Sequence, residues 1–185
     1  MDNSEVIPFE SMFMIPYLQL TVNDWDNKKK KLLELMSKCT LTDPNSIIKS
    51  SFRDESSNKH NDLVKSIFED ELSKVQKSFG FNYYSINYSW FQEQTKNMFH
   101  PIHDHSESNT MMSAICYIDY DSSEHSPTHF ISPFVNSFYF GHEYFLPKEV
   151  TEGTIIFFPS NILHQTLPSP SDKPRRIISF NMELR

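Results

Sequence analysis

Two closely spaced histidines and a distant third are the residues of this chain best suited to metal chemistry. His103 and His105 flank Asp104, and His164 follows the apolar run 154–158 and a short turn. Residues i and i+2 of a strand point to the same side, so His103 and His105 could bind one ion together. Imidazole nitrogens suit Fe, Zn, Cu and Ni, and a facial set of three leaves positions open for substrate and O₂. The pattern predicts a metal site without choosing the metal, although an isolated H-x-H pair also arises by chance.

A second chemical feature is the arginine pair Arg175-Arg176 at the start of the last apolar segment, 177–182. A guanidinium that enters an apolar strand is costly unless it meets an anion. Its planar fork can grip a carboxylate through two parallel hydrogen bonds. Because neighbouring strand residues face opposite ways, only one of the two arginines can point inward. The alternative interpretation is a surface pair next to Pro174.

The first part of the chain has the spacing of helices. An alternating apolar segment, 6–22, predicts one or two strands broken at Pro16. Asp24 then stands where a cap would begin a helix, and a second helix ends near Gly80. The apolar side chains on one face of each helix are Leu32, Leu33, Leu35 and Met36 in the first and Leu63, Ile67, Phe68, Leu72 and Val75 in the second. Residues 40–58 are rich in Ser, Asn, Asp and Lys and predict a loop.

The part of the chain after Gly80 has the pattern of a β-rich body. Short apolar segments separated by turn residues predict strands near 83–90, 111–117, 138–145, 154–158 and 177–182. Short strands of this kind are typical of an antiparallel sandwich or barrel. We therefore expect a single α+β domain over residues 1–185, with helical support over about 1–80 and a β-rich core over about 81–185.

Composition excludes several classes of function. The 185 residues are 38% hydrophobic and 14% aromatic, which suffices for a packed core, and three glycines are too few for a glycine-rich phosphate loop. The net charge of −7 disfavours a nucleic-acid partner, and Lys28–Lys31 fits the solvated face of a helix. Two distant cysteines give no disulfide framework. Because neither a signal peptide nor an apolar run of about 20 residues is present, we expect a soluble cytoplasmic protein without a membrane partner.

Four motifs in sequence order resemble the 2-oxoglutarate- and Fe(II)-dependent oxygenase superfamily. They are His103-x-His105, Ser113–Ile118, Phe158–Pro168 and Arg175–Asn181. The likeness is strongest to oxygenases of bacteria and tailed phages that carry an H-x-H motif, and it extends over residues 88–182. The resemblance implies a double-stranded β-helix, the jelly-roll fold of the cupins, with the N-terminal helices packed on one sheet.

The resemblance also implies that His103, His105 and His164 hold the iron. The middle ligand in this superfamily is commonly Asp or Glu, so His105 departs from that pattern, although H-x-H looks usual in the phage-like branch. Three interpretations stay open: His105 ligates, water takes its position, or Asp104 or Glu107 reaches the metal. We prefer the first, which gives a site more positive than one that contains a carboxylate.

The same resemblance implies roles around 2-oxoglutarate. Arg175 matches the residue that pairs with the far carboxylate, and it shares the strand parity of Ser179, whereas Arg176 does not. Ser179 is therefore expected beside the co-substrate. Tyr117 matches a tyrosine whose hydroxyl binds the same carboxylate, with a core aromatic as the alternative. Ile177 replaces the family's first serine in this strand, which removes one hydrogen bond to the carboxylate.

The activity that the resemblance implies is oxidation of a substrate by O₂, with 2-oxoglutarate as co-substrate and succinate and CO₂ as products, most commonly a hydroxylation. The substrate stays open between a protein side chain, a small molecule and a nucleobase, and a homodimer is compatible with the sequence. A phage-encoded protein would act in the host cytoplasm. The alternatives are a cupin-type metal protein that uses no 2-oxoglutarate and a non-catalytic jelly-roll module for binding or structure. The aromatic residues expected to wall the pocket are Tyr88, Trp90 and Phe157, and the histidines expected in a substrate cleft or at the surface are His100, His125, His129 and His142.

Overall fold

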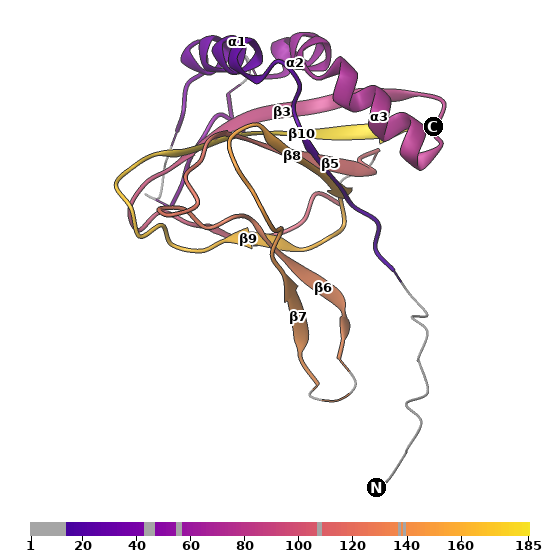
Figure 1. Cartoon of the computed structure of the whole chain (residues 1–185), viewed down its shortest axis with the longest axis vertical. Helices are drawn as coiled ribbons and strands as arrows, with labels where there is room; N and C mark the ends of the chain where they lie inside the picture. Colours follow the sequence, from indigo (N-terminus) through magenta and orange to yellow (C-terminus); the bar gives the residue numbers. More distant parts are fainter. Residues whose placement is uncertain (1–13, 43–46, 55–56, 107–108, 137, 139) are drawn as a thin grey trace, which may run out of the picture.

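The structure, a computed structural model, consists of two antiparallel sheets that face each other and of helices that cover one of them (Figure 1). It describes residues 14–42, 47–54, 57–106, 109–136, 138 and 140–185. Among these residues, the larger sheet has the strand order β1-β8-β5-β10-β3-β2 and the smaller sheet the order β4-β9-β6-β7. This arrangement confirms the α+β, double-stranded β-helix fold that the sequence predicts.

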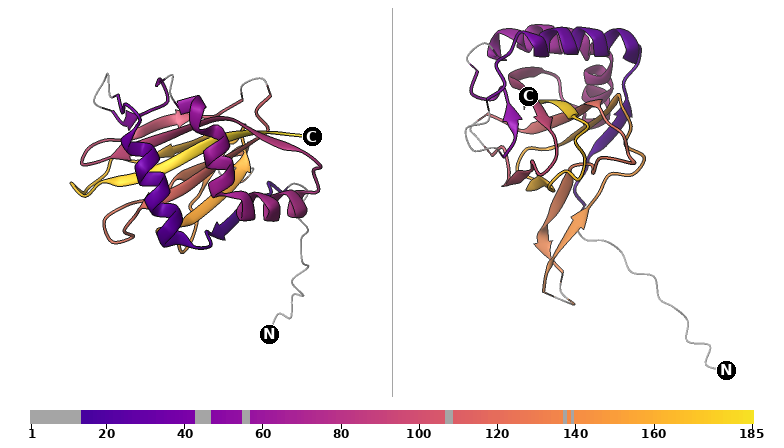
Figure 2. Two further views of the ribbon diagram at one scale, coloured as in Figure 1. Left: turned by 90° about the horizontal axis from the view of Figure 1, so that it is seen from above. Right: turned by 90° about the vertical axis from the view of Figure 1, so that its left-hand side faces the viewer.

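The larger sheet is built from β1 (Leu18–Thr21), β2 (Lys49–Ser50), β3 (Tyr84–Gln94), β5 (Met112–Asp119), β8 (Thr154–Pro159) and β10 (Arg175–Leu184). The smaller sheet is built from β4 (His100–His103), β6 (His129–Val135), β7 (His142–Phe145) and β9 (His164–Thr166). The helices are α1 (Trp25–Ser37), α2 (Asn61–Ile67) and α3 (Glu69–Phe79), and the 3₁₀ turn η1 (Ser57–His60) precedes α2. All three α-helices lie across the outer face of the larger sheet, as the view from above shows (Figure 2).

The helices form where the sequence predicts them, with two local differences. The side chain of Asp24 caps no backbone N–H of α1 and instead accepts a hydrogen bond from Nδ2 of Asn27 at 2.7 Å. The expected second helix is two helices, α2 and α3, which meet at the fully buried Phe68. Gly80 ends α3 with φ at 75°, a conformation that costs glycine little. No helix in the described ranges is long and apolar enough to cross a membrane.

The strands differ from the prediction mainly where they are short. The strand predicted within 6–22 is present as β1, whereas its residues 6–13 lie outside the described part of the chain. The strand predicted over 138–145 is confined to β7. Strands β2, β4 and β9 contain two, four and three residues, too few to show the alternation by which a strand is recognised in a sequence.

The central strands of the larger sheet have one apolar face and one mixed face. In β10, Ile178, Phe180 and Met182 belong to the core beneath the helices. Ser179 and Asn181 alternate with them and line cavities on the side of the smaller sheet. Since successive side chains of a strand point to opposite faces, these polar residues mark the inner face as the one that can bind a ligand.

The core between helices and sheet is expected to supply much of the stability. Leu72 on α3 is fully buried, so Leu72→Ala should lower the free energy of unfolding by about 2–5 kcal/mol through lost burial and the cavity left behind. Leu63→Ala on α2 makes the same chemical change at a side chain that is 52% exposed and should stay within about 0.5 kcal/mol of the wild type. Urea denaturation of the two variants measures the difference. Equal effects would show that this layer is loosely packed.

The hairpin of β6 and β7 extends away from the rest of the molecule (Figures 1 and 2). Its exposed large apolar side chains are Phe134, Val135, Phe138, Phe140, Tyr144 and Phe145. All four residues of β7 are exposed, and β7 pairs only with β6 among the described strands. The smaller sheet therefore ends in an exposed and largely uncharged edge.

Candidate metal centre and buried arginine

Three histidine side chains converge between the two sheets. The candidate ligand atoms of His103, His105 and His164 all lie within 4.8 Å of one another. His103 ends β4 and His164 begins β9, and the two residues are direct partners across these antiparallel strands. The backbone N–H of His105 donates to the carbonyl of Ser160 at 2.8 Å, which holds the loop after β4 against the end of β8. The structure thus brings together the three histidines that the sequence singles out.

Hydrogen bonds set the protonation of two of these rings. Nδ1 of His103 lies 2.8 Å from the carbonyl oxygen of Pro101, and Nδ1 of His164 lies 2.9 Å from that of Ile162. A carbonyl oxygen only accepts, so each Nδ1 carries the proton and each Nε2 keeps a lone pair. Nε2 of His105 is buried and has no hydrogen-bond partner among the described residues. Lone pairs without a donor, on rings oriented by backbone carbonyls, are what a transition-metal ion requires of its ligands.

Burial keeps the imidazoles of the cluster neutral. It lowers the pKa of His103, and it lowers the pKa of His164 well below its usual value. It also lowers the pKa of His105 to about 4. For His164 and His105 the second cause is electrostatic repulsion from His103. His100, whose ring centroid lies 3.9 Å from that of His103, has its pKa lowered to about 3 by burial and by the nearby cations. Neutral imidazole is the form that binds metal, so the cluster is ready for an ion at neutral pH.

These lowered pKa values predict that the metal-free protein loses stability in mild acid. Below about pH 6.5 the unfolded chain takes up protons at these histidines and the folded protein does not, so the free energy of unfolding falls as the pH falls toward about 4. Thermal melting between about pH 7.5 and about pH 5, above the ordinary carboxyl range, measures this loss. His100→Gln removes one contributing group and should make the decline shallower. A melting temperature that stays constant over this range would contradict the prediction.

Arg175 is a buried cation with no anionic partner among the residues that the structure describes. Its side chain is 2% exposed, and burial lowers its pKa. Nη2 donates to Oγ1 of Thr128 at 3.2 Å, Nη1 lies 3.5 Å from Oε1 of Gln94, and Nε has no partner among the described residues. The guanidinium carbon lies 5.1 Å from the centre of the Tyr117 ring. Burying a guanidinium among neutral groups alone costs free energy, because the charge loses its hydration. Binding of a carboxylate would offset this cost.

Arg176 points to the opposite face of the sheet. It forms ion pairs with Glu93 at 2.8 Å and Asp119 at 3.0 Å. Strand alternation therefore separates the two arginines as expected, with Arg175 directed between the sheets. Tyr117, also fully buried, uses its hydroxyl oxygen to accept the backbone N–H of Thr128 at 3.0 Å. Thr128, which the sequence gave no reason to select, thus contacts two of the three predicted co-substrate residues, Arg175 and Tyr117.

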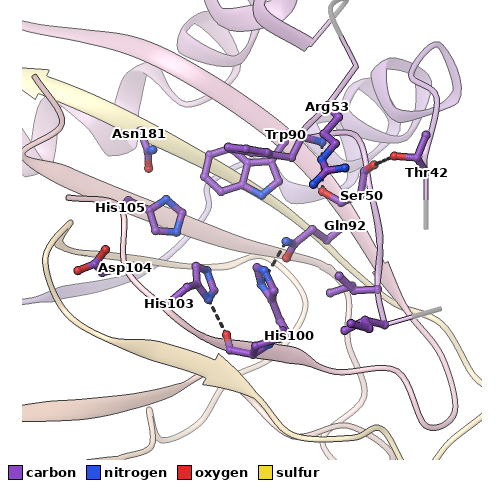
Figure 3. A pocket seen from close by; sticks show the side chains of 14 residues that line it. Thr42, Ser50, Arg53, Trp90, Gln92, His100, His103, Asp104, His105 and Asn181 are labelled. Atoms are coloured by element: carbon purple, nitrogen blue, oxygen red, sulfur yellow. Dashed lines mark hydrogen bonds between the residues drawn. The ribbon is translucent and has the colours of Figure 1, made fainter. Parts of the chain in front are cut away.

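Two adjacent spaces, which share several wall residues, adjoin the histidines. A small inner cavity of about 20 Å³ is lined by the three histidines together with Thr128 and Ser179. An outer pocket of about 410 Å³ shares the walls formed by His103 and His105 and extends past Trp90 toward β2 (Figure 3). Ser179 thus lines the same cavity as the three histidines, and its place beside the co-substrate stays a prediction.

Some of the more peripheral predictions need correction. Trp90 lines both spaces, and Tyr88 packs against its ring. The prediction that Phe157 walls the pocket is wrong, because this residue faces the core under the helices. His125 is neither in a cleft nor at the surface: it is buried, and it accepts the N–H of Asp121 through Nδ1.

The remaining polar residues near the site also have defined places. His129 is buried and contacts the hydroxyl of Ser126, His100 lines the outer pocket, and His142 is exposed. Asp104 bonds to Ser106 and lies outside the three-histidine cluster, and Glu107 lies outside the described residues.

Several solved structures share this fold at low sequence identity. A prolyl-4-hydroxylase of Pseudomonas putida superposes with a TM-score of 0.61 at 12% identity, covering 92% of this chain and 94% of its own. A 2OG-Fe(II) oxygenase family oxidoreductase of Burkholderia pseudomallei has a TM-score of 0.66 at 13% identity, covering 90% and 84%. The viral collagen prolyl hydroxylase of Paramecium bursaria Chlorella virus-1, solved with 2OG, has a TM-score of 0.56 at 11% identity, covering 90% and 94%. At such identities the likeness shows the fold.

Sequence comparison identifies the family. No curated protein has a sequence that matches this chain. The family model described as "Putative 2OG-Fe(II) oxygenase" matches residues 88–181, half of the chain, from β3 to β10. This range contains the three histidines, Tyr117 and Arg175. The chain therefore belongs to this family of 2-oxoglutarate- and Fe(II)-dependent oxygenases and is an oxidoreductase.

Proposed function

We propose that this protein is an Fe(II)- and 2-oxoglutarate-dependent dioxygenase that hydroxylates its substrate and releases succinate and CO₂. The observation that carries the proposal is the combination of three converging neutral imidazoles with a buried guanidinium that meets no carboxylate among the described residues. The imidazoles suit iron, and the guanidinium suits a dicarboxylate. A cupin-type metal protein without a co-substrate would have no need of a buried cation at this place.

In this proposal His103, His105 and His164 hold one iron ion, each through the nitrogen that keeps its lone pair. With 2-oxoglutarate and O₂ the iron supplies the oxidising chemistry. Arg175 pairs with the far carboxylate of 2-oxoglutarate. Because the hydroxyl of Tyr117 accepts the N–H of Thr128, its own proton is available to the same carboxylate.

The co-substrate needs more room than the inner cavity of about 20 Å³ provides. Gln92 and His100 line both this cavity and the outer pocket, so rotation of their side chains would join the two spaces. Nε2 of Gln92 lies 3.4 Å from Nδ1 of His100, a long and weak hydrogen bond whose loss costs little. We propose that 2-oxoglutarate enters by displacing this pair.

Hydroxylation is the outcome named for two of the similar structures, the prolyl-4-hydroxylase and the viral collagen prolyl hydroxylase. We extend that outcome to this chain as part of the proposal.

An anaerobic titration tests the proposal directly. Adding Fe(II) and then 2-oxoglutarate to the metal-free protein should produce a weak visible charge-transfer band that saturates at one equivalent of each. Admission of O₂ should then release succinate, measured by mass spectrometry. A protein that binds iron but gives no band with 2-oxoglutarate would instead be a cupin-type metal protein, and one that binds neither would be a non-catalytic module.

A further inference from the structure

The outer pocket has an apolar wall beside the histidines. Ile47, Ile48, Phe52 and Trp90 form this wall. The rings of Phe52 and Trp90 meet edge to face with centroids 5.3 Å apart, and the Trp90 ring stacks on that of His105 at 5.2 Å. A volume of about 410 Å³ suits a small molecule rather than a folded partner. The pocket can thus hold the apolar part of a ligand that reaches from β2 to the three-histidine cluster.

The cation Arg53 lines the same pocket. Of the four arginines of the chain, Arg176 and Arg185 form ion pairs and Arg175 is buried, whereas Arg53 has no ion pair with any residue that the structure describes. Figure 3 shows its guanidinium beside Trp90 and Ser50, at the opposite end of the pocket from Asp104. Its guanidinium is thus free of a described carboxylate and can pair with an anion that enters the pocket.

One described carboxylate, Asp104, lines the pocket, and it forms no ion pair with Arg53. The carboxylate of Asp104 accepts hydrogen bonds from the hydroxyl and the N–H of Ser106, at 2.9 and 3.4 Å. The described part of the pocket therefore offers Arg53 as a cation that no carboxylate neutralises, which favours a ligand that carries an anionic group.

We propose that the substrate is a small organic acid whose carboxylate or phosphate group pairs with Arg53. Its apolar body lies along the wall formed by Ile47, Ile48, Phe52 and Trp90, and this placement presents a C–H group to the three histidines. The fork of arginine binds either anion through two hydrogen bonds. The inference rests on the proposed dioxygenase function and adds the substrate class to it.

Matched ligands test the inference without knowledge of the natural substrate. The probes are 3-phenylpropanoate, its neutral isostere 3-phenylpropanamide, and 2-phenylethyl phosphate, titrated calorimetrically into the protein loaded anaerobically with Fe(II) and 2-oxoglutarate. We expect the wild type to bind at least one anion about tenfold more tightly than the amide, as a charge-assisted pair implies. The anion that shows the preference identifies the group recognised.

Three variants test whether Arg53 causes the preference for the anion over the amide. Arg53→Ala should remove the preference for the anion and leave the affinity for the amide unchanged, and Arg53→Lys should keep part of it. Arg185→Ala makes the same change of net charge at an exposed arginine paired with Glu183 and should keep all of it. Since the side chain of Arg53 is exposed, its replacement should leave the fold intact.

The outcomes that overturn the inference are distinct from those that overturn the proposed function. Equal binding of acid and amide, a preference that survives Arg53→Ala, or no binding of any probe would reject the anionic substrate while the charge-transfer band persists. Loss of the band in the wild type would reject the dioxygenase proposal and, with it, this substrate class.

Discussion

We expect His164→Ala to lower 2-oxoglutarate turnover by more than about a hundredfold, because loss of an outer-shell partner alone costs a metal site 10–100-fold and this change removes a proposed ligand. The side chain of His164 is buried, and its Nδ1 is fixed by the carbonyl of Ile162, so the variant loses a ligand that is already oriented toward the other two histidines. Succinate release measures turnover, and the visible band with Fe(II) and 2-oxoglutarate measures assembly of the site. Both should disappear.

His142→Ala is the matched control for this prediction. It removes an imidazole from the exposed β7 strand, outside the three-histidine cluster. Turnover and the visible band should match the wild type. If His164→Ala kept the band while circular dichroism showed an intact fold, the metal assignment would be wrong.

The neighbouring residues Arg175 and Arg176 should respond to the same substitution in opposite ways. Arg175→Met removes a fully buried charge that meets no anion in the described part of the chain, so the ligand-free protein should gain about 1–4 kcal/mol of unfolding free energy. The same variant should bind 2-oxoglutarate at least about thirtyfold more weakly, because it removes one partner of a buried charge pair. A gain in stability together with a loss of binding is the signature of a site held ready for an anion.

Arg176→Met gives the contrast, since it breaks the ion pairs with Glu93 and Asp119 on the other face of the sheet. These pairs are partly solvated, so the loss of unfolding free energy should stay within about 1 kcal/mol and the affinity for 2-oxoglutarate should not change. Thermal melting and calorimetric titration with 2-oxoglutarate measure the two effects. If Arg175→Met destabilised the protein and bound 2-oxoglutarate normally, the arginine would be a structural residue.

Features that repeat along the chain could be predicted from the sequence. The alternation in β10 indicated which arginine points inward, because Ile178 and Phe180 continue one face and Ser179 the other. The helical spacing of α1 was equally readable. Features set by tertiary contacts could not be predicted, such as the break between α2 and α3 at Phe68, where burial outweighs helical continuity.

The site shows the same division. The histidines were recognisable from residue type and motif spacing, whereas β4 and β9, which place His103 opposite His164, are too short to show a period. Thr128 and Arg53 carry no local signal, since their importance comes only from what they adjoin in space. Phe157 was misplaced because the strand 154–158 is apolar on both faces, so composition could not tell the inner face from the outer.

The direct pairing of His103 with His164 means that a metal ion would act as a clip between two segments far apart in the chain. Such a clip stabilises mainly β4 and β9 of the smaller sheet, to which two of its three ligands belong, since β5 and β10 are already held by the core under the helices. Chelation should therefore speed amide hydrogen exchange in β4 and β9 and leave β5 and β10 protected, as mass spectrometry of deuterated peptides would show. In the cell, iron supply would then govern how long this half of the protein resists proteases, as well as how fast the enzyme works.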